Sequence, residues 1–216
     1  MKEQTVARLR EIGIIPIVRT DSADVAIPVA EALLQAGLPV VEITMTVPNA
    51  IDTIAGLAKR VAGKMLIGAG TVTYAEAARR TIDAGAQFIV TPCLVPEVIE
   101  VAIRAKVAVL PGALTPGEVF EAFRKGGDMV KIFPVQSVGG AAYVRALRAP
   151  FPGIPLVPTG GVTLENIAEL FQAGAAAVGI GTELISKEAL ARHDYAAIEA
   201  LAKKFLAKVR QARLSS

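Results

Sequence analysis

The chain has 216 residues, of which 53% are hydrophobic, 5% aromatic and 20% charged, with a formal net charge of +3 at pH 7. Its one cysteine rules out an intramolecular disulfide, its one histidine rules out a metal site of clustered histidines, and its small charge excess argues against nucleic-acid binding. The length suits one domain over residues 1–216, and the aliphatic composition is typical of α/β proteins.

The amino-terminal segment, MKEQTVARLREIG, is polar and amphipathic. It predicts a helix over residues 1–12 rather than a signal sequence. No apolar run reaches the roughly 18 residues of a membrane span, so we expect no membrane association. Together with the lone cysteine, Cys93, these features predict a cytoplasmic protein.

Eight short apolar runs follow in chain order, each rich in aliphatic residues and bounded by turn-forming residues. Such runs are typical of strands that are buried on both faces. The runs lie at residues 14–19, 40–44, 65–70, 88–92, 107–112, 129–134, 155–160 and 177–182.

Segments with helical periodicity separate these runs, for example at residues 23–37, 50–63 and 164–174. Several end in glycine, which adopts the left-handed conformation of a helix end at little cost. Strands that alternate with helices predict parallel pairing through right-handed crossovers. Eight such units predict a single (β/α)₈ barrel, a TIM barrel, with the extra amino-terminal helix covering its closed end.

A doubly wound open sheet is the alternative fold. It usually has fewer strands, and its cofactor-binding form carries a glycine-rich turn after the first strand. Here the first run continues into VRTDSAD, which contains no glycine. We therefore favour the barrel.

Three charged residues interrupt the apolar runs: Arg19 in the first, Glu42 in the second and Lys131 in the sixth. Each is expected in the carboxyl-terminal half of its strand, toward the rim where barrel enzymes carry their active sites. An unpaired buried charge is costly, so each needs a compensating role. A structural salt bridge from Glu42 to Lys131 or Arg19 is the alternative explanation, and it is compatible with catalysis.

A lysine, a carboxylate and an arginine without metal ligands suit Schiff-base chemistry. An amine kept from water loses stabilisation of its charged form, and the free amine attacks a ketone or aldehyde. We expect Lys131 to form an imine with a keto acid and Glu42 to move protons, directly or through one water. Arg19 would bind the substrate carboxylate. A pyridoxal-phosphate enzyme, which also uses a strand lysine, is an alternative.

Glycine turns follow the last two predicted strands. PTGGV supplies Thr159, Gly160 and Gly161, and GIGTE supplies Gly181 and Thr182. Barrels often hold a phosphate at these two loops through backbone N–H groups, so we expect a phosphorylated substrate. The alternative is that the glycines only make tight turns.

Other predicted rim residues are less specific. Thr71, in GAGT, offers a hydroxyl, and Pro92 and Phe133 are placed to shield a pocket from water, although core packing explains Phe133 equally well. Cys93 follows the fourth run, but the chain has no base near it in sequence to activate the thiol, so we expect no nucleophilic role.

These motifs resemble those of the class I 2-keto-3-deoxy-6-phosphogluconate (KDPG) aldolases and their 4-hydroxy-2-oxoglutarate (KHG) and phosphogalactonate relatives. VVEIT, IGAGTV, AGAQFIVTP, LPGALTPGE, VKIFP and VPTGGV occur in the expected order over nearly the whole chain. The resemblance implies a (β/α)₈ homotrimer in which Lys131 is the Schiff-base lysine and Glu42 the general acid and base. The family's pocket and phosphate positions match Thr71, Pro92, Phe133, Gly160, Gly161 and Thr182.

One position departs from the family pattern. Many members follow the glutamate with an arginine that holds the substrate carboxylate, whereas EITMTVP places Thr46 there. We assign the carboxylate to Arg19, which resembles an arginine of other superfamily members.

The resemblance implies reversible cleavage of KDPG to pyruvate and glyceraldehyde 3-phosphate, without a cofactor or metal. KHG or the galactonate epimer as substrate is one alternative, and a non-catalytic phosphosugar-binding barrel is another.

Overall fold

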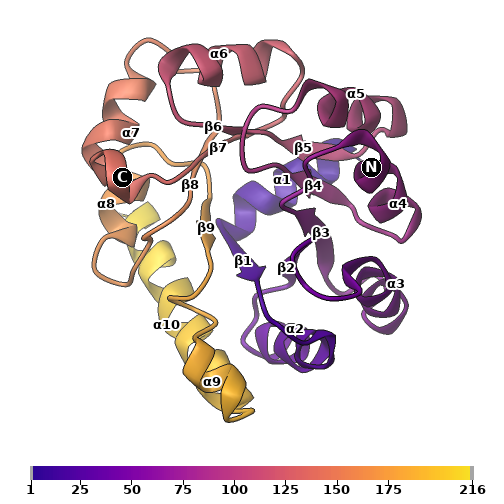
Figure 1. Cartoon of the computed structure of the whole chain (residues 1–216). Coiled ribbons are helices and arrows are strands. Elements are labelled where there is room, and N and C mark those ends of the chain that lie inside the picture. Colours follow the sequence, from indigo (N-terminus) through magenta and orange to yellow (C-terminus); the bar gives the residue numbers. More distant parts are fainter. Residues whose placement is uncertain (1, 215–216) are drawn as a thin grey trace.

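The computed structural model describes residues 2–214, in which strands and helices alternate along the chain (Figure 1). Each of the eight predicted strand runs contains at least one strand. The strands are β1 (Ile14–Val18), β2 (Val40–Thr44), β3 (Leu66–Gly70), β4 (Phe88–Val90), β5 (Ala108–Leu110), β6 (Gly112–Ala113), β7 (Val130–Ile132), β8 (Leu156–Pro158) and β9 (Val178–Ile180). The α-helices are α1 (Lys2–Ile12), α2 (Ala26–Gln35), α3 (Ala50–Arg60), α4 (Ala75–Asp83), α5 (Pro96–Ala105), α6 (Pro116–Arg124), α7 (Gly140–Arg148), α8 (Ile167–Gln172), α9 (Lys187–Ala191) and α10 (Tyr195–Leu214), and two short 3₁₀ turns are η1 (Ala23–Val25) and η2 (Gln136–Val138).

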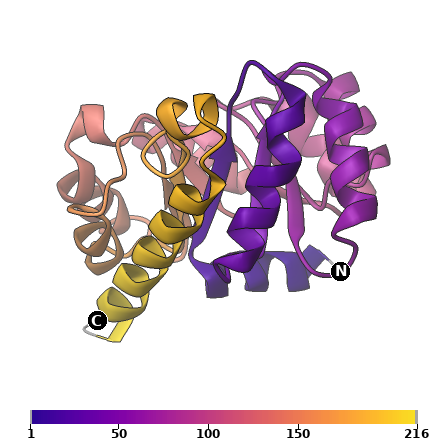
Figure 2. The ribbon, with the colours of Figure 1, turned by 90° about the horizontal axis from the view of Figure 1, so that it is seen from below.

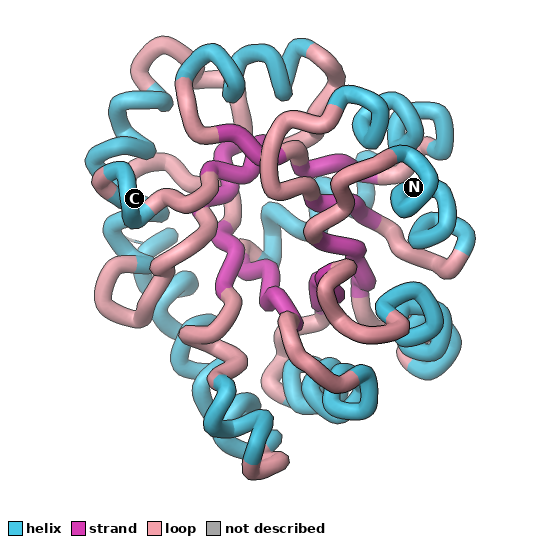
Figure 3. Tube along the Cα trace, in the orientation of Figure 1, coloured by secondary structure: helices cyan, strands magenta, loops and turns pink. Residues whose placement is uncertain are grey.

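The strands lie at the centre of the molecule and the helices surround them (Figure 3). They pair in two parallel sheets, one in the order β5-β4-β3-β2-β1-β9 and the other in the order β6-β7-β8. A parallel bridge joins Thr159, directly after β8, to Gly179 in β9. The predicted parallel α/β fold is therefore confirmed, with the longer sheet curled around the centre.

The predicted single sheet of eight strands differs from this pairing at the fifth run, which divides into β5 and β6 at Pro111. Proline has no N–H and cannot donate a hydrogen bond across the sheet. On its far side the N–H of Gly112 donates to the Thr91 hydroxyl (3.0 Å) rather than to a strand carbonyl. Gly112 also lies against Pro92, whose backbone carbonyl carbon would be 2.4 Å from a Cβ at that position.

The strands are buried along almost their whole length because both of their faces are covered. All five residues of β1 and all five of β2 are buried. Parallel sheets that are sandwiched between layers of side chains lack the alternating polar face of an antiparallel sheet. A charged residue inside one of these strands is therefore surrounded by hydrocarbon rather than water.

The first and last helices meet on one side of the molecule (Figure 2). From α10, the Arg213 guanidinium donates to the backbone carbonyls of Glu11 and Arg10, each at 2.6 Å. Carbonyls in the last turn of a helix have no partner within the helix, so this side chain caps α1. Gly13 leaves room for the contact, since a Cβ there would lie 2.4 Å from Nη2 of Arg213.

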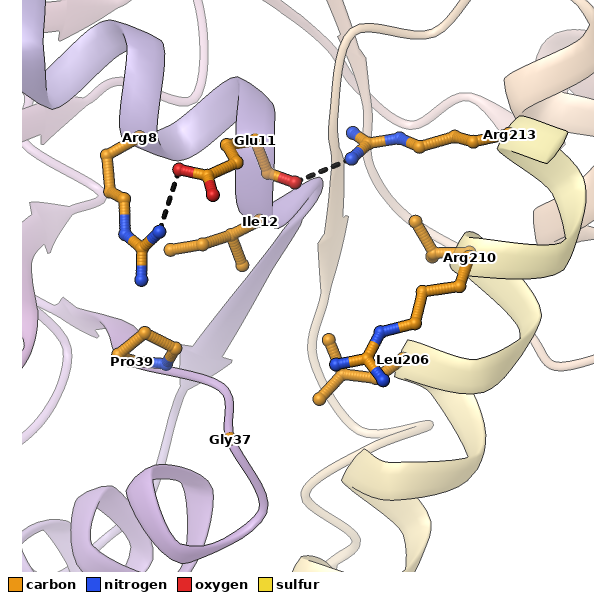
Figure 4. Close-up of a pocket in the computed structure, with 9 residues that line it drawn as sticks. Arg8, Glu11, Ile12, Gly37, Pro39, Leu206, Arg210 and Arg213 are labelled. Atoms are coloured by element: carbon orange, nitrogen blue, oxygen red, sulfur yellow. Dashed lines mark hydrogen bonds and ion pairs between the residues drawn. The ribbon is translucent and has the colours of Figure 1, made fainter.

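A cavity of about 290 Å³ lies beside this contact, between α1, the segment before β2 and α10 (Figure 4). Arg8 on its wall pairs with Glu11 at 2.7 Å, whereas Arg210 has no hydrogen-bond or ion-pair partner within residues 2–214. The cavity is at the amino-terminal ends of β1 and β2, opposite the predicted active-site rim.

No helix within residues 2–214 has the length and apolarity needed to cross a membrane.

Removal of the α1 cap should destabilise the fold. Replacing Arg213 by Ala deletes three hydrogen bonds from a charged donor, two to α1 and a longer one to the carbonyl of Ala176. Because the side chain is partly exposed, we expect a loss of about 1–2 kcal/mol in the free energy of unfolding. Urea denaturation followed by circular dichroism measures it. Arg210→Ala, on the same helix but without a partner, is the matched control and should stay within about 0.5 kcal/mol of the parent. Equal losses in the two variants would contradict the capping role.

Candidate active site

The three predicted charges lie on or beside central strands, but at different depths. Glu42 is the middle residue of β2 and is 2% exposed, and Lys131 is the middle residue of β7 and is 6% exposed. Arg19 directly follows β1 and is exposed. The prediction that all three occupy the carboxyl-terminal halves of their strands is therefore wrong in detail. Arg19 lies beyond its strand because β1 ends one residue before the apolar run does, and Glu42 and Lys131 each lie at the middle of their strand. The arginine stands at the rim and the other two lie below it.

Glu42 is a carboxyl group held in a nearly dry environment. Burial raises its pKa, while the positive charges of Lys131 and Arg19 pull the pKa down by a smaller amount. Its Oε1 atom has no hydrogen-bond partner within residues 2–214. A buried oxygen without a partner is destabilising, and such atoms mark positions where a substrate or water completes the bonding.

A glycine on the neighbouring strand makes room for this carboxyl. A Cβ on Gly70, the last residue of β3, would lie 1.8 Å from Oε1 of Glu42. The side chain that approaches the backbone of GAGT most closely is therefore that of Glu42. The next residue, Thr71, has a φ of 56°, a left-handed conformation that is strained for a β-branched side chain. Strain of this kind concentrates at functional sites.

The Lys131 side chain lies over an aromatic ring. Its Nζ atom is 5.0 Å from the centroid of Phe133, close enough for a cation–π contact. No ion pair joins Lys131 or Arg19 to Glu42 within residues 2–214, so the salt bridge that offered a purely structural explanation does not form. Phe133 is 37% exposed, which places it at the wall of the site rather than in the core.

The loops that follow β1 and β2 are tied together at the rim. The Thr44 hydroxyl donates to the carbonyl of Val18 (3.1 Å) and shares a hydrogen bond with the hydroxyl of Thr46 (2.8 Å). Arg19 follows Val18 directly. The position that lacks the expected arginine, Thr46, therefore belongs to the same part of the rim as Arg19.

The two predicted glycine turns are brought side by side by the bridge between Thr159 and Gly179. Gly160 and Gly161 both have positive φ angles, +90° and +78°. The N–H groups of six residues in these turns donate no hydrogen bond to residues 2–214, and they belong to Gly160, Gly161, Val162, Gly181, Thr182 and Glu183. Free N–H groups on adjacent loops are a suitable cradle for an anion.

Thr159 and Pro92 make structural contacts that the sequence did not predict. Thr159 is 4% exposed and its hydroxyl donates to the carbonyl of Val157 (3.1 Å), so it supports the glycine turn from below. Pro92 is partly buried after β4, where its backbone meets Gly112.

Sequence reasoning missed two polar residues beside the glycine turn. Asn166 donates from Nδ2 to the carbonyl of Gly161 (2.7 Å) and to Oε1 of Gln136 (3.4 Å). Gln136 follows the Lys131 strand, and Asn166 precedes α8. A sequence signal for the loop that contains Gln136 is a second glycine pair, Gly139-Gly140. Both of these glycines have positive φ angles.

No group of three or more His, Cys, Asp or Glu within residues 2–214 is placed to hold a metal ion.

The chain is similar to known proteins over most of its length. A family model described as KDPG and KHG aldolase matches residues 5–201. The chain is 34% identical to the 2-dehydro-3-deoxy-phosphogluconate aldolase of Pseudomonas aeruginosa, over 98% of this chain and 97% of that protein. It is 37% identical to the 2-dehydro-3-deoxy-6-phosphogalactonate aldolase of Escherichia coli, over 81% of this chain and 85% of that protein.

Two solved structures are similar over most of the chain. The KDPG aldolase of Legionella pneumophila, with pyruvate captured as a covalent carbinolamine intermediate, has a TM-score of 0.85 and 29% identity and covers 92% of this chain and 96% of that one. A protein cage designed by fusing symmetric oligomeric domains has a TM-score of 0.86 and 33% identity and covers 94% of this chain and 74% of that one.

The raised pKa of Glu42 predicts how stability depends on pH. A carboxyl whose pKa is higher in the folded than in the unfolded state binds more protons when folded, so stability falls as pH rises from the ordinary glutamate value through the raised one. Ionising this carboxyl in its buried position is destabilising. We therefore expect Glu42→Gln to unfold at a higher urea concentration than the parent at pH 7, with the difference narrowing as pH falls toward 4.

The exposed Glu97, which lies at the start of α5, provides the control for this measurement. Glu97→Gln should show no comparable pH-dependent difference. A Glu42→Gln variant less stable than the parent at pH 7 would argue that the carboxylate stabilises the fold.

Proposed function

The chain belongs to the KDPG and KHG aldolase family, and on that premise we propose that it cleaves KDPG to pyruvate and glyceraldehyde 3-phosphate through a Schiff base. It is thus a carbon–carbon lyase. The observation that carries the proposal is the pair of buried charges, Lys131 and Glu42, on strands that face one site without an ion pair between them. The carbinolamine captured in the Legionella relative supports the covalent route.

The chemistry needs one amine and one carboxyl group. The Lys131 amine adds to the C2 carbonyl of the substrate, and loss of water gives a protonated imine. Glu42 takes the proton of the C4 hydroxyl, directly or through a water, while the C3–C4 bond breaks. The electrons of the C3–C4 bond move to the imine, which becomes the enamine of pyruvate. The C4 fragment leaves as the aldehyde. Protonation at C3 and addition of water release pyruvate and restore the amine.

A raised carboxyl pKa suits Glu42 to both of its proton transfers. An acid–base group works best when its pKa is near the working pH, because it must accept and return a proton in one cycle. Burial raises the pKa of Glu42, and the positive charges of Lys131 and Arg19 limit the rise. Its unpartnered Oε1 is available to a substrate hydroxyl or a bridging water.

The remaining predicted residues have binding roles in this proposal. Arg19 holds the substrate carboxylate at the rim, and Thr71, Pro92 and Phe133 enclose the keto acid. The phosphate is bound by the two turns that carry Gly160, Gly161, Gly181 and Thr182. The unbonded N–H groups of these turns and the exposed position of Arg19 support this arrangement.

We further propose that the two sheets work as one (β/α)₈ barrel in a single domain over residues 1–216, with α1 across its closed end. Pro111 alone separates β5 from β6, and the Thr159–Gly179 bridge links the other two edges.

The galactonate epimer of the substrate is the second candidate. The Escherichia coli phosphogalactonate aldolase is 37% identical to this chain, and Thr46 stands where many KDPG enzymes carry arginine. Parallel assays with both epimers and with KHG distinguish the three substrates.

The protein is proposed to be a cytoplasmic homotrimer. The similar domain in the designed cage was chosen as a symmetric oligomer, which supports an assembly of this kind. The surface of α6 is the best candidate for the contact, since Phe120 is 51% exposed and Phe123 is 40% exposed. The neighbouring helix α5 (Figure 1) carries Ile103, which is 41% exposed. Phe151 stacks on Phe120 at 5.8 Å between ring centroids. With these two residues the apolar strip extends beyond α6.

A charge in this strip should disrupt the assembly. We expect Phe123→Asp to lower the mass from three chains to one in light scattering after size exclusion, with an unchanged circular dichroism spectrum, because burying a carboxylate between subunits is unfavourable. Leu214→Asp, at a residue that is 90% exposed, is the control and should stay trimeric. A trimeric Phe123→Asp variant would place the contact elsewhere, and a monomeric parent would refute the trimer.

Schiff-base formation can be tested directly. Incubation with pyruvate and borohydride should reduce the imine to a stable amine on Lys131, detected by mass spectrometry of the peptides. We expect Lys131→Met to keep the fold and to lose at least about 10³-fold in turnover, since no other amine replaces the nucleophile. Lys64→Met, a change on the surface, should retain the adduct and the turnover. An adduct on another lysine, or turnover in Lys131→Met, would overturn the mechanism.

A further inference from the structure

The loop after the Lys131 strand is attached to the glycine turn after β8. The N–H of Val135 donates to the carbonyl of Thr159 (2.9 Å), and the N–H of Gln136 donates to the carbonyl of Gly160 (3.2 Å). Gly161 packs against the side chain of Gln136, since a Cβ on Gly161 would lie 2.5 Å from Cβ of Gln136. The turn therefore rests on the segment that continues from β7.

Asn166 clamps this turn from the other side. Its Nδ2 group donates to the carbonyl of Gly161 (2.7 Å) and to Oε1 of Gln136 (3.4 Å), while its Oδ1 accepts from the N–H of Thr163 (2.9 Å). One side chain thus joins the glycine turn, the loop after β7 and the segment that leads into α8.

The bond to Gly161 fixes the direction of a whole peptide group. In a trans peptide the N–H points opposite to the C=O. Holding the Gly161 carbonyl toward Asn166 therefore directs the N–H of Val162 the other way, and this N–H donates to no residue within 2–214. Two consecutive glycines with positive φ angles otherwise leave the turn with more backbone freedom than any other residue pair.

We propose that Asn166 is a positioning residue for recognition of the substrate phosphate. It pre-orients the Gly161–Val162 peptide so that the N–H is ready for a phosphate oxygen, and through Gln136 it sets the turn at a fixed place relative to the Lys131 strand. This inference rests on the proposed function, in which the turn binds the phosphate. Pre-orientation improves affinity because less conformational freedom is lost on binding.

Asn166 also precedes α8, and its Oδ1 helps to shape that helix start. The two roles use different atoms of the side chain, so they can be separated. Asn166→Asp keeps an oxygen for the Thr163 N–H but replaces the Nδ2 donor by an acceptor that repels the Gly161 carbonyl. Thr163→Ala is the matched control, because it removes the hydroxyl that accepts from the N–H groups of Glu165 and Asn166 and leaves the clamp intact.

The experiment compares substrates with and without phosphate. For Asn166→Asp we expect KM for KDPG to rise about tenfold or more, the effect of one lost hydrogen bond to a charged ligand. The kcat for KDPG and KM for KHG, which has no phosphate, should change less than about twofold. Inorganic phosphate, titrated against the protein by NMR, should bind correspondingly more weakly. Thr163→Ala should match the parent in all of these measurements.

Equal increases in KM for KDPG and KHG, or equal effects of the two variants, would overturn the positioning role. Unchanged phosphate binding in Asn166→Asp would overturn it as well. Failure of the proposed function has a different signature, namely a parent protein that forms no reduced pyruvyl adduct on Lys131. The phosphate titration needs no turnover, so it tests the clamp even in that case.

Discussion

The site depends on keeping two opposite charges in a nearly dry interior without letting them pair. Glu42 and Lys131 are 2% and 6% exposed, and no ion pair between them forms within residues 2–214. Direct contact would stabilise both charges and reduce the reactivity of each. At their actual separation Lys131 lowers the pKa of Glu42 only in part, so burial still leaves the carboxyl with a raised pKa. The fold therefore bears a local destabilisation at the residue to which the proposed function assigns proton transfer.

The short parallel strands make this arrangement possible. Each strand is covered on both faces, so the interior is apolar, and glycines admit the few polar groups that enter it. Gly70 leaves space for the Glu42 carboxyl in the interior, and at the surface Gly161 leaves space for the exposed Gln136 side chain. Arg19 and the glycine turn after β9 follow neighbouring strand ends, because β1 pairs with β9. In the proposed function, Arg19 and the paired glycine turns bind the carboxylate and the phosphate of the substrate at this rim. In the proposed function, chemistry and recognition are thus placed at different depths of the fold.

Much of the fold could be predicted from the sequence, because hydrophobic periodicity and the turn residues that bound each element are local properties. All eight strand runs, the alternating helices and the three charges out of place in apolar runs were visible in the letters. The division of the fifth strand was not, since it depends on how Pro111 and Gly112 meet Thr91 and Pro92 across the sheet.

Side-chain hydrogen bonds between loops could not be predicted from the sequence either. Asn166 and Gln136 are 30 residues apart, and neither lies in a motif with a chemical signature. The position of Arg19 beyond the end of β1 could not be predicted either, because an apolar run in the sequence does not show where strand pairing ends. Predicted roles for the site residues remain predictions, whereas membership of the family follows from the match over residues 5–201.

The most direct test of this account is the titration of the Glu42 carboxyl itself, followed by NMR with ¹³C-labelled glutamate in the parent protein and in Lys131→Met. The account predicts a pKa above the ordinary glutamate value in the parent, and a further rise when the lysine charge is removed. A parent pKa at or below the ordinary value, or no response to the loss of Lys131, would contradict it.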